Sequence, residues 1–426
     1  MTTVFAAIIS VINGIKWSDL ENSIIKAINS INQPILIILV ISMMMGAWLL
    51  SGIVPTMIYY GFKLISPSVF LPTACLLASI TSLSTGDSWG TAGTVGLAIM
   101  AIGVGFGIPA PIVAGVVISG AYFGDKLSPV SDTTVLAAAV SDVDLFDHVK
   151  YMLLTTVPSI TIAIIAYYFI GLKYSHNIDV TQINELLNVL KDSFNINPLL
   201  LLAPIAVMAM IALKVKPIPA LMAGTILGAA FAMIFQGAIL KDVLEVLHYG
   251  VELNTGNEMI DELISGGGMH FIMWTLSLIY CAMGLGGVLD GSGALEAVAS
   301  KILARVRSTG DLIAATVVTA IMLNITAADQ FMAIIFPGKM YKEEYIKRGI
   351  NLKVLSRTVE DAGTVTSSLV PWATCGAFMT VTLGVHPLQY LPYAIFNWLC
   401  PILAIIYGYT NFKIAYTDKV EEEQAI

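Results

Sequence analysis

A polar stretch of eleven residues lies inside an apolar region long enough to cross a membrane. It covers residues 124–134, after the apolar run 108–123 and directly before the apolar run 135–140. In a membrane interior, irregular backbone is tolerated only where protein or a water-filled cavity covers its polar groups. We therefore expect the chain to fold so that this stretch lines an internal cavity.

Composition places the whole chain in the membrane class. Only 12% of the 426 residues are charged and 57% are hydrophobic, whereas soluble domains carry about 25% charged residues. Many of the apolar runs approach the roughly 20 residues that a membrane-spanning helix needs. We expect an all-α polytopic membrane protein.

Several other classes are disfavoured. The net charge is −8, and no basic patch with interleaved aromatic residues indicates a nucleic-acid partner. The four cysteines have no paired spacing and the five histidines are scattered, so we expect no cofactor and no transition-metal site. Because no catalytic dyad is evident, we do not expect an enzyme.

Two parts of the chain repeat at an offset of 242 residues. This offset lays Asp87 on Asp329, and it places the break at Pro129 opposite the break at Pro371. In both parts, an apolar segment with a polar centre precedes an apolar segment with a proline break. Interrupted segments at matching positions are typical of secondary transporters, and they point to the binding site.

Charge placement predicts that the two repeats are inverted. Basic residues flank the apolar segment around Asp329 on both sides, between Lys301 and Arg307 and between Lys339 and Arg357. An excess of Lys and Arg indicates the cytoplasm, and about 30 residues are too few for two spans. We therefore expect a re-entrant hairpin that enters from the cytoplasm. Its partner in the first repeat would enter from outside, because an odd number of spans separates the two.

These inferences divide the chain into five parts. Residues 1–33 would form a partial N-terminal span and an interfacial helix, and residues 172–269 linking spans and an acidic loop. Repeat 1 would cover residues 34–171, with a hairpin at 67–107 and a broken helix at 109–140. Repeat 2 would cover residues 270–412, with a hairpin at 310–340 and a broken helix at 354–385. Residues 413–426 would form a cytoplasmic tail.

The breaks contain side chains that suit a hard cation such as sodium. Carboxylate, hydroxyl and carbonyl oxygens are hard ligands, and a carboxylate inside a membrane marks a functional site by default. The candidate residues for binding a cation or a proton are Asp132, Asp87, Asp125, Ser128, Ser131, Thr133, Thr134, Ser88, Asp329, Asn324, Thr326, Ser367, Ser368 and Thr374. Sodium would be the only metal, at these same residues.

Such a site can exchange a cation for a proton. Removal from water disfavours the charged form of a carboxyl group, which can then hold a proton at cellular pH. A proton and a sodium ion would compete for one aspartate while the cavity opens to alternate sides. Asp132, with hydroxyl groups on both sides of it in the sequence, is the leading candidate.

Structural roles compete with ion binding at these aspartates. Asp125 could pair with its neighbour Lys126, and Asp361 could be a cytoplasmic ion-pair partner of Arg357. Asp132 could cap the helix that follows it, which is compatible with ion binding.

Asp87 and Asp329 have a structural alternative too. Each could be a turn residue at a hairpin tip, although their matching positions in the repeat favour a role in the site.

Several motifs resemble the NhaC-type sodium/proton antiporter family. The most specific is Ile118-Ser-Gly-Ala-Tyr-Phe-Gly-Asp-Lys-Leu-Ser-Pro-Val-Ser-Asp-Thr-Thr134, and Thr85-Gly-Asp-Ser-Trp-Gly-Thr-Ala-Gly-Thr94 is a second. The resemblance covers nearly the whole chain from about residue 10. It implies the ion transporter superfamily, with inverted repeats, re-entrant hairpins, discontinuous helices, an elevator-like movement and often a homodimer.

The resemblance also implies a function and a location. We expect sodium/proton exchange in a bacterial or archaeal cytoplasmic membrane, with sodium, lithium as a second candidate, protons and the lipid bilayer as partners and with a cytoplasmic C-terminus. The family commonly has Ser where this chain has Asp87, and its members usually have a longer N-terminal hydrophobic segment, so one span could be missing.

The same family includes sodium-linked malate/lactate antiporters, which provide the alternative function. An organic dianion needs compensating positive charge, and the inferred site has five aspartates but only Lys126. The charges therefore favour a cation exchanger.

Overall fold

The described residues fold mainly into α-helices. This computed structural model describes residues 1–64, 67–175, 180–213, 215–252 and 265–417, and within these ranges it has no β-strand. Among the same residues, six helices are long and apolar enough to cross a membrane, or seven if the bent pair Leu187–Ser193 and Pro198–Ile211 is one span. The prediction of an all-α polytopic membrane protein is confirmed.

The helices up to residue 175 are α1 Thr2–Ile12, α2 Trp17–Ser30, α3 Asn32–Leu50, α4 Ile53–Leu64, α5 Phe70–Thr85, α6 Ser88–Thr91, α7 Leu97–Gly105, α8 Ala110–Leu127, α9 Asp132–Val140 and α10 Leu145–Ser175. The next four are α11 Val180–Ser193, α12 Leu202–Ala212, α13 Pro217–Phe235 and α14 Leu240–Tyr249. A π-helical turn, Ala92–Gly96, joins α6 to α7.

The helices of the remaining chain are α16 Met273–Gly291, α17 Ala294–Leu303, α18 Thr309–Thr326, α19 Gln330–Lys347, α20 Leu352–Val359, α21 Val365–Ser367, α22 Thr374–Leu383, α23 Pro387–Tyr390 and α24 Ile395–Thr410. A second π-helical turn, Glu360–Thr364, lies between α20 and α21.

Several elements differ in extent from the sequence-based prediction. α2 continues almost directly into α3, and together they form a helix of 34 residues, Trp17–Leu50. α19 extends past residue 340 to Lys347, where Glu344 forms an ion pair with Arg348 one turn further on, a spacing that stabilises helices. Residues 253–264 of the predicted acidic loop and 418–426 of the predicted tail lie outside the described residues.

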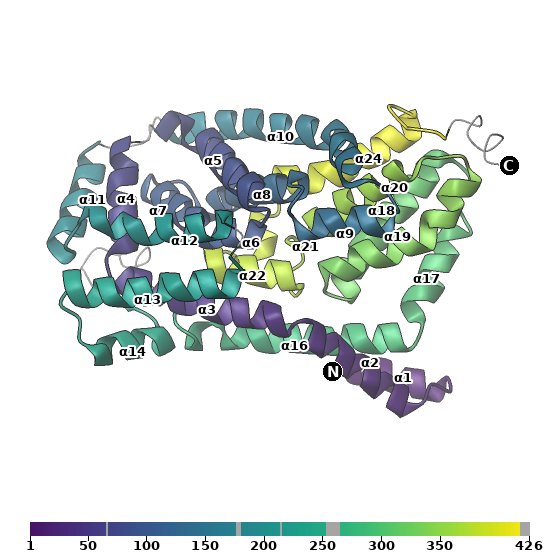
Figure 1. The fold of residues 1–426 in the computed structure, drawn as a ribbon, viewed down its shortest axis with the longest axis horizontal. Coiled ribbons are helices and arrows are strands. Elements are labelled where there is room, and N and C mark those ends of the chain that lie inside the picture. Colours follow the sequence, from purple (N-terminus) through teal and green to yellow (C-terminus); the bar gives the residue numbers. More distant parts are fainter. Residues whose placement is uncertain (65–66, 176–179, 214, 253–264, 418–426) are drawn as a thin grey trace.

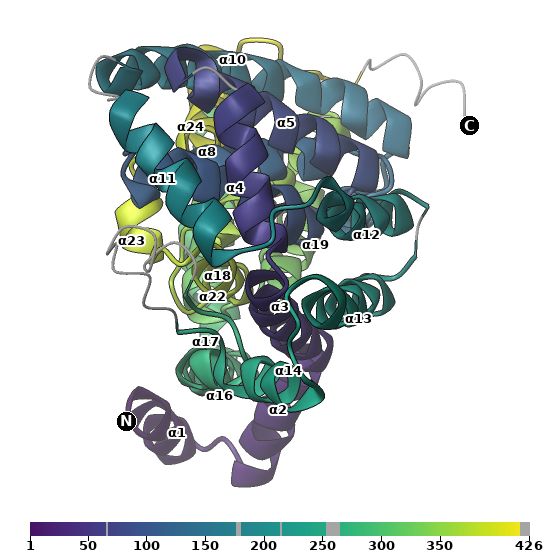
Figure 2. The same cartoon turned by 90° about the vertical axis from the view of Figure 1, so that its left-hand side faces the viewer.

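The helices surround a central region of short segments. In Figure 1, α5, α8 and α10 lie along the upper edge, α18 to α20 lie on the right, and α3, α13 and α16 lie below. The short helices α6 and α22 lie between these groups. Figure 2 shows α3 beside α13 and α16 beside α2, and both pairs are in contact.

Glycines allow α5 and α8 to pack closely. A Cβ atom at Gly120 would lie 2.5 Å from the carbonyl oxygen of Cys75, and a Cβ atom at Gly124 would lie 2.3 Å from the backbone nitrogen of Leu83. Small residues at a helix interface let two backbones approach, as is common in membrane proteins. This contact fixes the end of α8 against the end of α5.

Two helix-to-helix turns have the same local geometry. α5 ends at Gly86, which has φ +70°, and α18 is followed by Ala328, which has φ +57°. The next residue in each turn, Asp87 or Asp329, caps the following helix by accepting a backbone N–H bond of 2.9 Å on its carboxylate. These turns are 242 residues apart.

Two further helices are interrupted. Residues 128–131 separate α8 from α9, and residues 368–373 separate α21 from α22. The prolines at both breaks cannot donate a backbone hydrogen bond, so the helical pattern stops there. The breaks and the turns provide the irregular backbone around the candidate site.

Candidate cation-binding site

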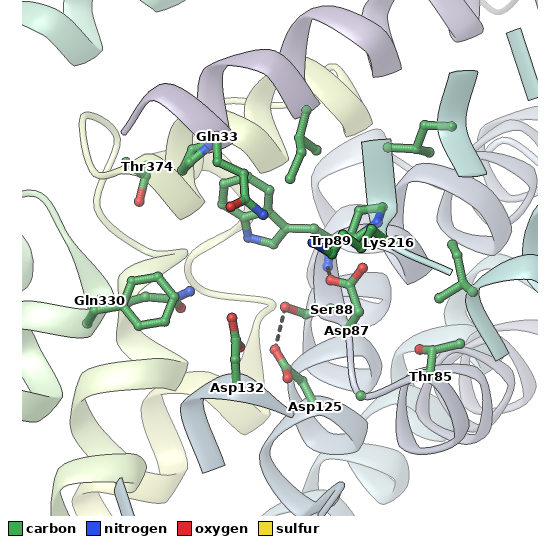
Figure 3. Close-up of a pocket in the computed structure, with 18 of the residues that line it drawn as sticks. Gln33, Thr85, Asp87, Ser88, Trp89, Asp125, Asp132, Lys216, Gln330 and Thr374 are labelled. Carbon is green, nitrogen blue, oxygen red and sulfur yellow. Dashed lines mark hydrogen bonds between the residues drawn. The ribbon is translucent and has the colours of Figure 1, made fainter. Parts of the chain in front are cut away.

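A cavity of about 470 Å³ lies where the turns and breaks meet (Figure 3). It is bounded by the start of α3, the α5–α6 turn, the α8–α9 break, the α12–α13 connection, the α18–α19 turn and the start of α22. Its polar side chains are Ser30, Gln33, Thr85, Asp87, Ser88, Asp125, Asp132, Lys216, Asp329, Gln330 and Thr374. Polar groups from distant parts of the chain therefore meet in one space.

Asp125 is one of two buried carboxylates of the cavity, with Asp329. Its Oδ2 atom accepts a 2.7 Å hydrogen bond from the Ser88 hydroxyl, and its Oδ1 atom accepts one of 2.6 Å from the Ser131 hydroxyl. Figure 3 shows the bond from Ser88, which joins the first turn to the end of α8. Two hydroxyl donors on one carboxylate stabilise its charged form, and their oxygens lie where a bound cation could use them.

The predicted pairing of Asp125 with Lys126 is wrong. Successive residues on a helix point about 100° apart, so Asp125 faces the cavity and Lys126 faces away from it. The Lys126 ammonium group instead forms a buried ion pair with Asp361. It also donates a 2.7 Å hydrogen bond to the Thr156 hydroxyl of α10.

Asp361 has the predicted partner but not the predicted surroundings. Its Oδ2 atom lies 3.6 Å from Nε of Arg357, and both side chains are fully buried. The Thr155 hydroxyl also donates to Asp361, at 2.9 Å. This cluster is inside the protein rather than at a cytoplasmic surface, and none of its members lines the cavity.

Asp132 lies at the mouth of the α8–α9 break. It is the first residue of α9, and its exposed side chain projects into the same space as Asp125 and Asp87 in Figure 3. Its Oδ1 atom accepts a 2.8 Å bond from the N–H of Thr133. Asp132 is not the N-cap that was considered as its alternative role, because Ser131 occupies the cap position and Asp132 is the first residue of α9.

Six of the predicted residues line the cavity, namely Asp87, Ser88, Asp125, Asp132, Asp329 and Thr374. Two more, Ser131 and Thr133, lie directly behind it, where Thr133 donates a 3.2 Å bond to Glu360.

The other predicted residues donate hydrogen bonds to backbone carbonyl groups near the breaks. Ser128 donates to the Leu83 carbonyl at 2.9 Å and Thr134 to the Lys126 carbonyl at 3.0 Å. Further such bonds come from Asn324 to Gly363, from Thr326 to Met322, from Ser367 to Thr364 and from Ser368 to Val365.

Sequence reasoning missed several residues at the cavity. Gln33 and Lys216 come from α3 and from the α12–α13 connection, neither of which was assigned to the site. Trp89, which stacks on Phe378 with a ring separation of 4.1 Å, also lines the cavity and was not among the predicted site residues. The short basic connection before Pro217 was the available signal for Lys216, because it interrupts two apolar runs.

The charge of the cavity also differs from the prediction. Four aspartates line it and its one basic residue is Lys216, because Asp361 and Lys126 lie elsewhere. In the described part of the chain, no group of three His, Cys, Asp or Glu side chains could hold a metal ion. A sodium ion would therefore need hydroxyl, amide or water oxygens in addition to one or two carboxylates.

Comparisons with known proteins show the family to which the chain belongs. Residues 120–412 match the model of the Na+/H+ antiporter family. The chain is 39% identical over 400 residues to Na(+)/H(+) antiporter NhaC of Alkalihalophilus pseudofirmus, covering 93% of this chain and 86% of that protein. It is 37% identical to the malate-2H(+)/Na(+)-lactate antiporter of Bacillus subtilis (95% and 86% covered) and 36% identical to Na(+)/H(+) antiporter NhaC of Bacillus subtilis (93% and 88% covered). The chain therefore belongs to the Na+/H+ antiporter family.

Proposed function

We propose that this protein exchanges sodium for protons across a membrane by alternating access. The observation that carries the proposal is the presence of Asp87, Asp125, Asp132 and Asp329 on one cavity. Carboxylates at such a depth are costly unless they bind something, and a cation or a proton neutralises them. Two relatives named as Na+/H+ antiporters support the same function.

Asp125 and Asp132 bind the exchanged cation in this proposal. Asp125 contributes a carboxylate held by Ser88 and Ser131, and Asp132 contributes one that is open to the cavity. The hydroxyl oxygens and the amide of Gln330 complete a set of hard ligands. A proton on either carboxyl group removes the charge that attracts sodium, so the two ions compete.

The architecture we propose for this exchange is a pair of inverted repeats. The matching turns at Asp87 and Asp329 and the matching breaks before α9 and α22 support it. Each repeat then contributes one hairpin and one discontinuous helix to the cavity. Movement of the hairpins together with the broken helices would expose the cavity to alternate sides.

The cavity opens to the cytoplasm in this arrangement. Lys216 lies at its edge in a short basic connection between α12 and α13, and short basic loops favour the cytoplasmic side. The C-terminus would lie on the same side as the basic segment between Lys339 and Arg357, which is also placed in the cytoplasm. We assign the protein to a bacterial or archaeal cytoplasmic membrane as a homodimer, with lithium as a second transported cation.

A test in proteoliposomes decides the proposal. The purified protein is reconstituted without any organic acid, sodium is added outside, and an internal dye reports pH. Sodium should drive proton movement in the unmodified protein, whereas Asp125→Asn and Asp132→Asn should abolish it. Asp290→Asn, at an exposed position at the end of α16, is the matched control and should exchange normally.

Exchange of malate for lactate is the second candidate, and Lys216 is the observation that favours it. A basic side chain at the edge of the cavity could attract an organic anion, and a relative is named for that activity. If sodium alone moves no protons but malate inside and lactate outside restore the signal, sodium/proton exchange is refuted. Normal exchange in Asp132→Asn would instead remove only this residue from the site.

A further inference from the structure

A second buried carboxylate lies behind the cavity. Glu360 begins the π-helical turn between α20 and α21, and its side chain is fully buried. Its Oε1 atom accepts a 3.2 Å hydrogen bond from the Thr133 hydroxyl, and its Oε2 atom has no hydrogen-bond partner among the described residues. Within the same part of the chain it forms no ion pair, although the Lys126–Asp361 pair is close by.

A chain of hydroxyl groups connects Glu360 with Asp125. Ser131 Oγ lies 2.6 Å from Oδ1 of Asp125 and 3.1 Å from Oγ1 of Thr133, which lies 3.2 Å from Oε1 of Glu360. All four side chains are buried. Ser131 at the end of the α8–α9 break and Thr133 in the first turn of α9 place both hydroxyls between the two carboxylates, directly behind the cavity.

Counting hydrogens shows that this chain holds one more proton than its hydroxyls supply. It contains three oxygen–oxygen contacts, and each needs one hydrogen to be a hydrogen bond. Ser131 and Thr133 supply one hydrogen each. The third hydrogen must come from a carboxyl group, so either Asp125 or Glu360 is protonated when the chain is complete.

The charges of the buried cluster also indicate that one of the two carboxyl groups is protonated and the other is ionised. Lys126 and Arg357 are positive and Asp361 is negative, which leaves one positive charge in the buried cluster. One ionised carboxylate, either Asp125 or Glu360, balances it. Other titratable groups near the cluster are Tyr151, whose ring lies under Arg357, His148, which bonds to Ser356, Cys400, near Lys126, and Tyr345, near Arg357. Asp87 and Asp132 lie near Asp125 on its cavity side.

We propose that Glu360 is a second proton-binding site of the exchange cycle, connected to Asp125 by Ser131 and Thr133. When a cation binds to Asp125, the Asp125 proton moves to Ser131, the Ser131 proton moves to Thr133, and the Thr133 proton moves to Glu360. One proton is transferred along the chain, each hydroxyl keeps one hydrogen, and the proton released in exchange for the cation comes from Asp132, whose carboxyl group is open to the cavity. This inference rests on the proposed sodium/proton exchange, and it places the proton outside the cation's ligand shell.

Infrared spectroscopy of the purified protein at saturating sodium tests the proton's location directly. The unmodified protein should retain a protonated-carboxyl band in sodium, and this band should be lost in Glu360→Gln, whose amide has a similar shape. An unchanged band in Glu360→Gln would overturn the proposal. Because this measurement needs no transport, it decides the role of Glu360 even if the unmodified protein exchanges no protons for sodium.

Transport measurements test the hydroxyl relay. Thr133→Val should lower sodium-driven proton flux by about tenfold or more, since proton transfer depends on positioned groups, while sodium binding measured by calorimetry persists. Thr133→Ser, which keeps the hydroxyl, should restore the flux. Thr382→Val is the matched control, because Thr382 is a buried hydroxyl with no partner among the described residues. Equal flux in Thr133→Val and Thr382→Val would refute the relay.

Discussion

Asp361 neutralises positive charge in the interior of the protein. It lies between Lys126 of α8 and Arg357 of α20, and all three side chains are fully buried. Transfer of such charges out of water is costly and is compensated only by a close partner. The Lys126–Asp361 ion pair therefore connects the first broken helix to the second. Burial of either charge without the other would be unfavourable.

The charge of Asp361 can be removed without changing its shape. We expect Asp361→Asn to lower the free energy of unfolding by about 3–5 kcal/mol, because it leaves two buried cations without an anion. Asp142→Asn is the control, since Asp142 pairs with Lys342 at an exposed site where ion pairs contribute little. Thermal unfolding in detergent measures both variants, and equal midpoints would contradict the prediction.

At the scale of elements, α5 and α8 determine where the cavity carboxylates lie. Gly124 precedes Asp125, and the close approach of its Cα to α5 brings Ser88, just past the end of α5, within hydrogen-bond distance of Asp125. A wider separation of the two helices would break that bond. We therefore expect helix packing and the proposed ion binding to be coupled at this contact.

Gly124→Ala tests this coupling. The new methyl group would meet the backbone of Leu83 at 2.3 Å, so α5 must shift, and we expect both weaker sodium binding and a lower unfolding temperature. Gly284→Ala should leave both unchanged, because the nearest atom to its new methyl group is a side-chain carbon of Thr3 at 3.6 Å. Sodium titration by calorimetry and thermal unfolding provide the two measurements. Normal sodium affinity in Gly124→Ala would contradict the prediction, because it would show that sodium binding does not depend on the packing of α5 against α8.

The helix breaks and turns could be predicted from the sequence, because the residues at those positions determine them. The breaks at Pro129 and Pro371 follow from a missing backbone donor, and the turns at Asp87 and Asp329 follow from polar residues inside apolar runs. The direction in which a side chain points could not be predicted in the same way. Lys126 is adjacent to Asp125 in sequence, yet it faces a different set of helices.

For the whole molecule, the two ends of α13 can be used to determine which side of the membrane the cavity faces. It has 19 residues, Pro217–Phe235, and at 1.5 Å per residue it is about as long as the hydrocarbon core is thick. Lys216 precedes it beside the cavity, and Lys241 follows it on an exposed part of α14. In the proposed orientation, the two lysines therefore lie on opposite sides of the membrane.

Thiol labelling compares these two positions. In a Cys281→Ser background, which removes the exposed native cysteine, a membrane-impermeant maleimide should modify Lys216→Cys only in inside-out vesicles. Lys241→Cys should react only in right-side-out vesicles, which makes it the matched control. Reaction of both variants in the same vesicles would contradict the proposed orientation.

The composition of the cavity could be predicted only in part. Sequence analysis identified four aspartates of the cavity, because carboxylates in apolar segments are rare: Asp87, Asp125, Asp132 and Asp329. It did not identify Gln33 and Lys216, because polar residues at helix ends are common and do not stand out from their neighbours. Which distant ends meet is determined by packing of the whole bundle rather than by a local pattern.

The ion pair between Lys126 and Asp361 also makes the two parts of the chain unequal. At the offset of 242 residues, the position that corresponds to Lys126 is Ser368 and the position that corresponds to Asp361 is Ser119. Ser119 bonds to Tyr167 and Ser368 to Asn397, each within its own surroundings. A chain assembled from two copies of the first part would bury the lysine without its acid, and two copies of the second part would bury the acid without its lysine. Each part therefore carries one member of the pair, and a chain built from two copies of either part would lack this ion pair.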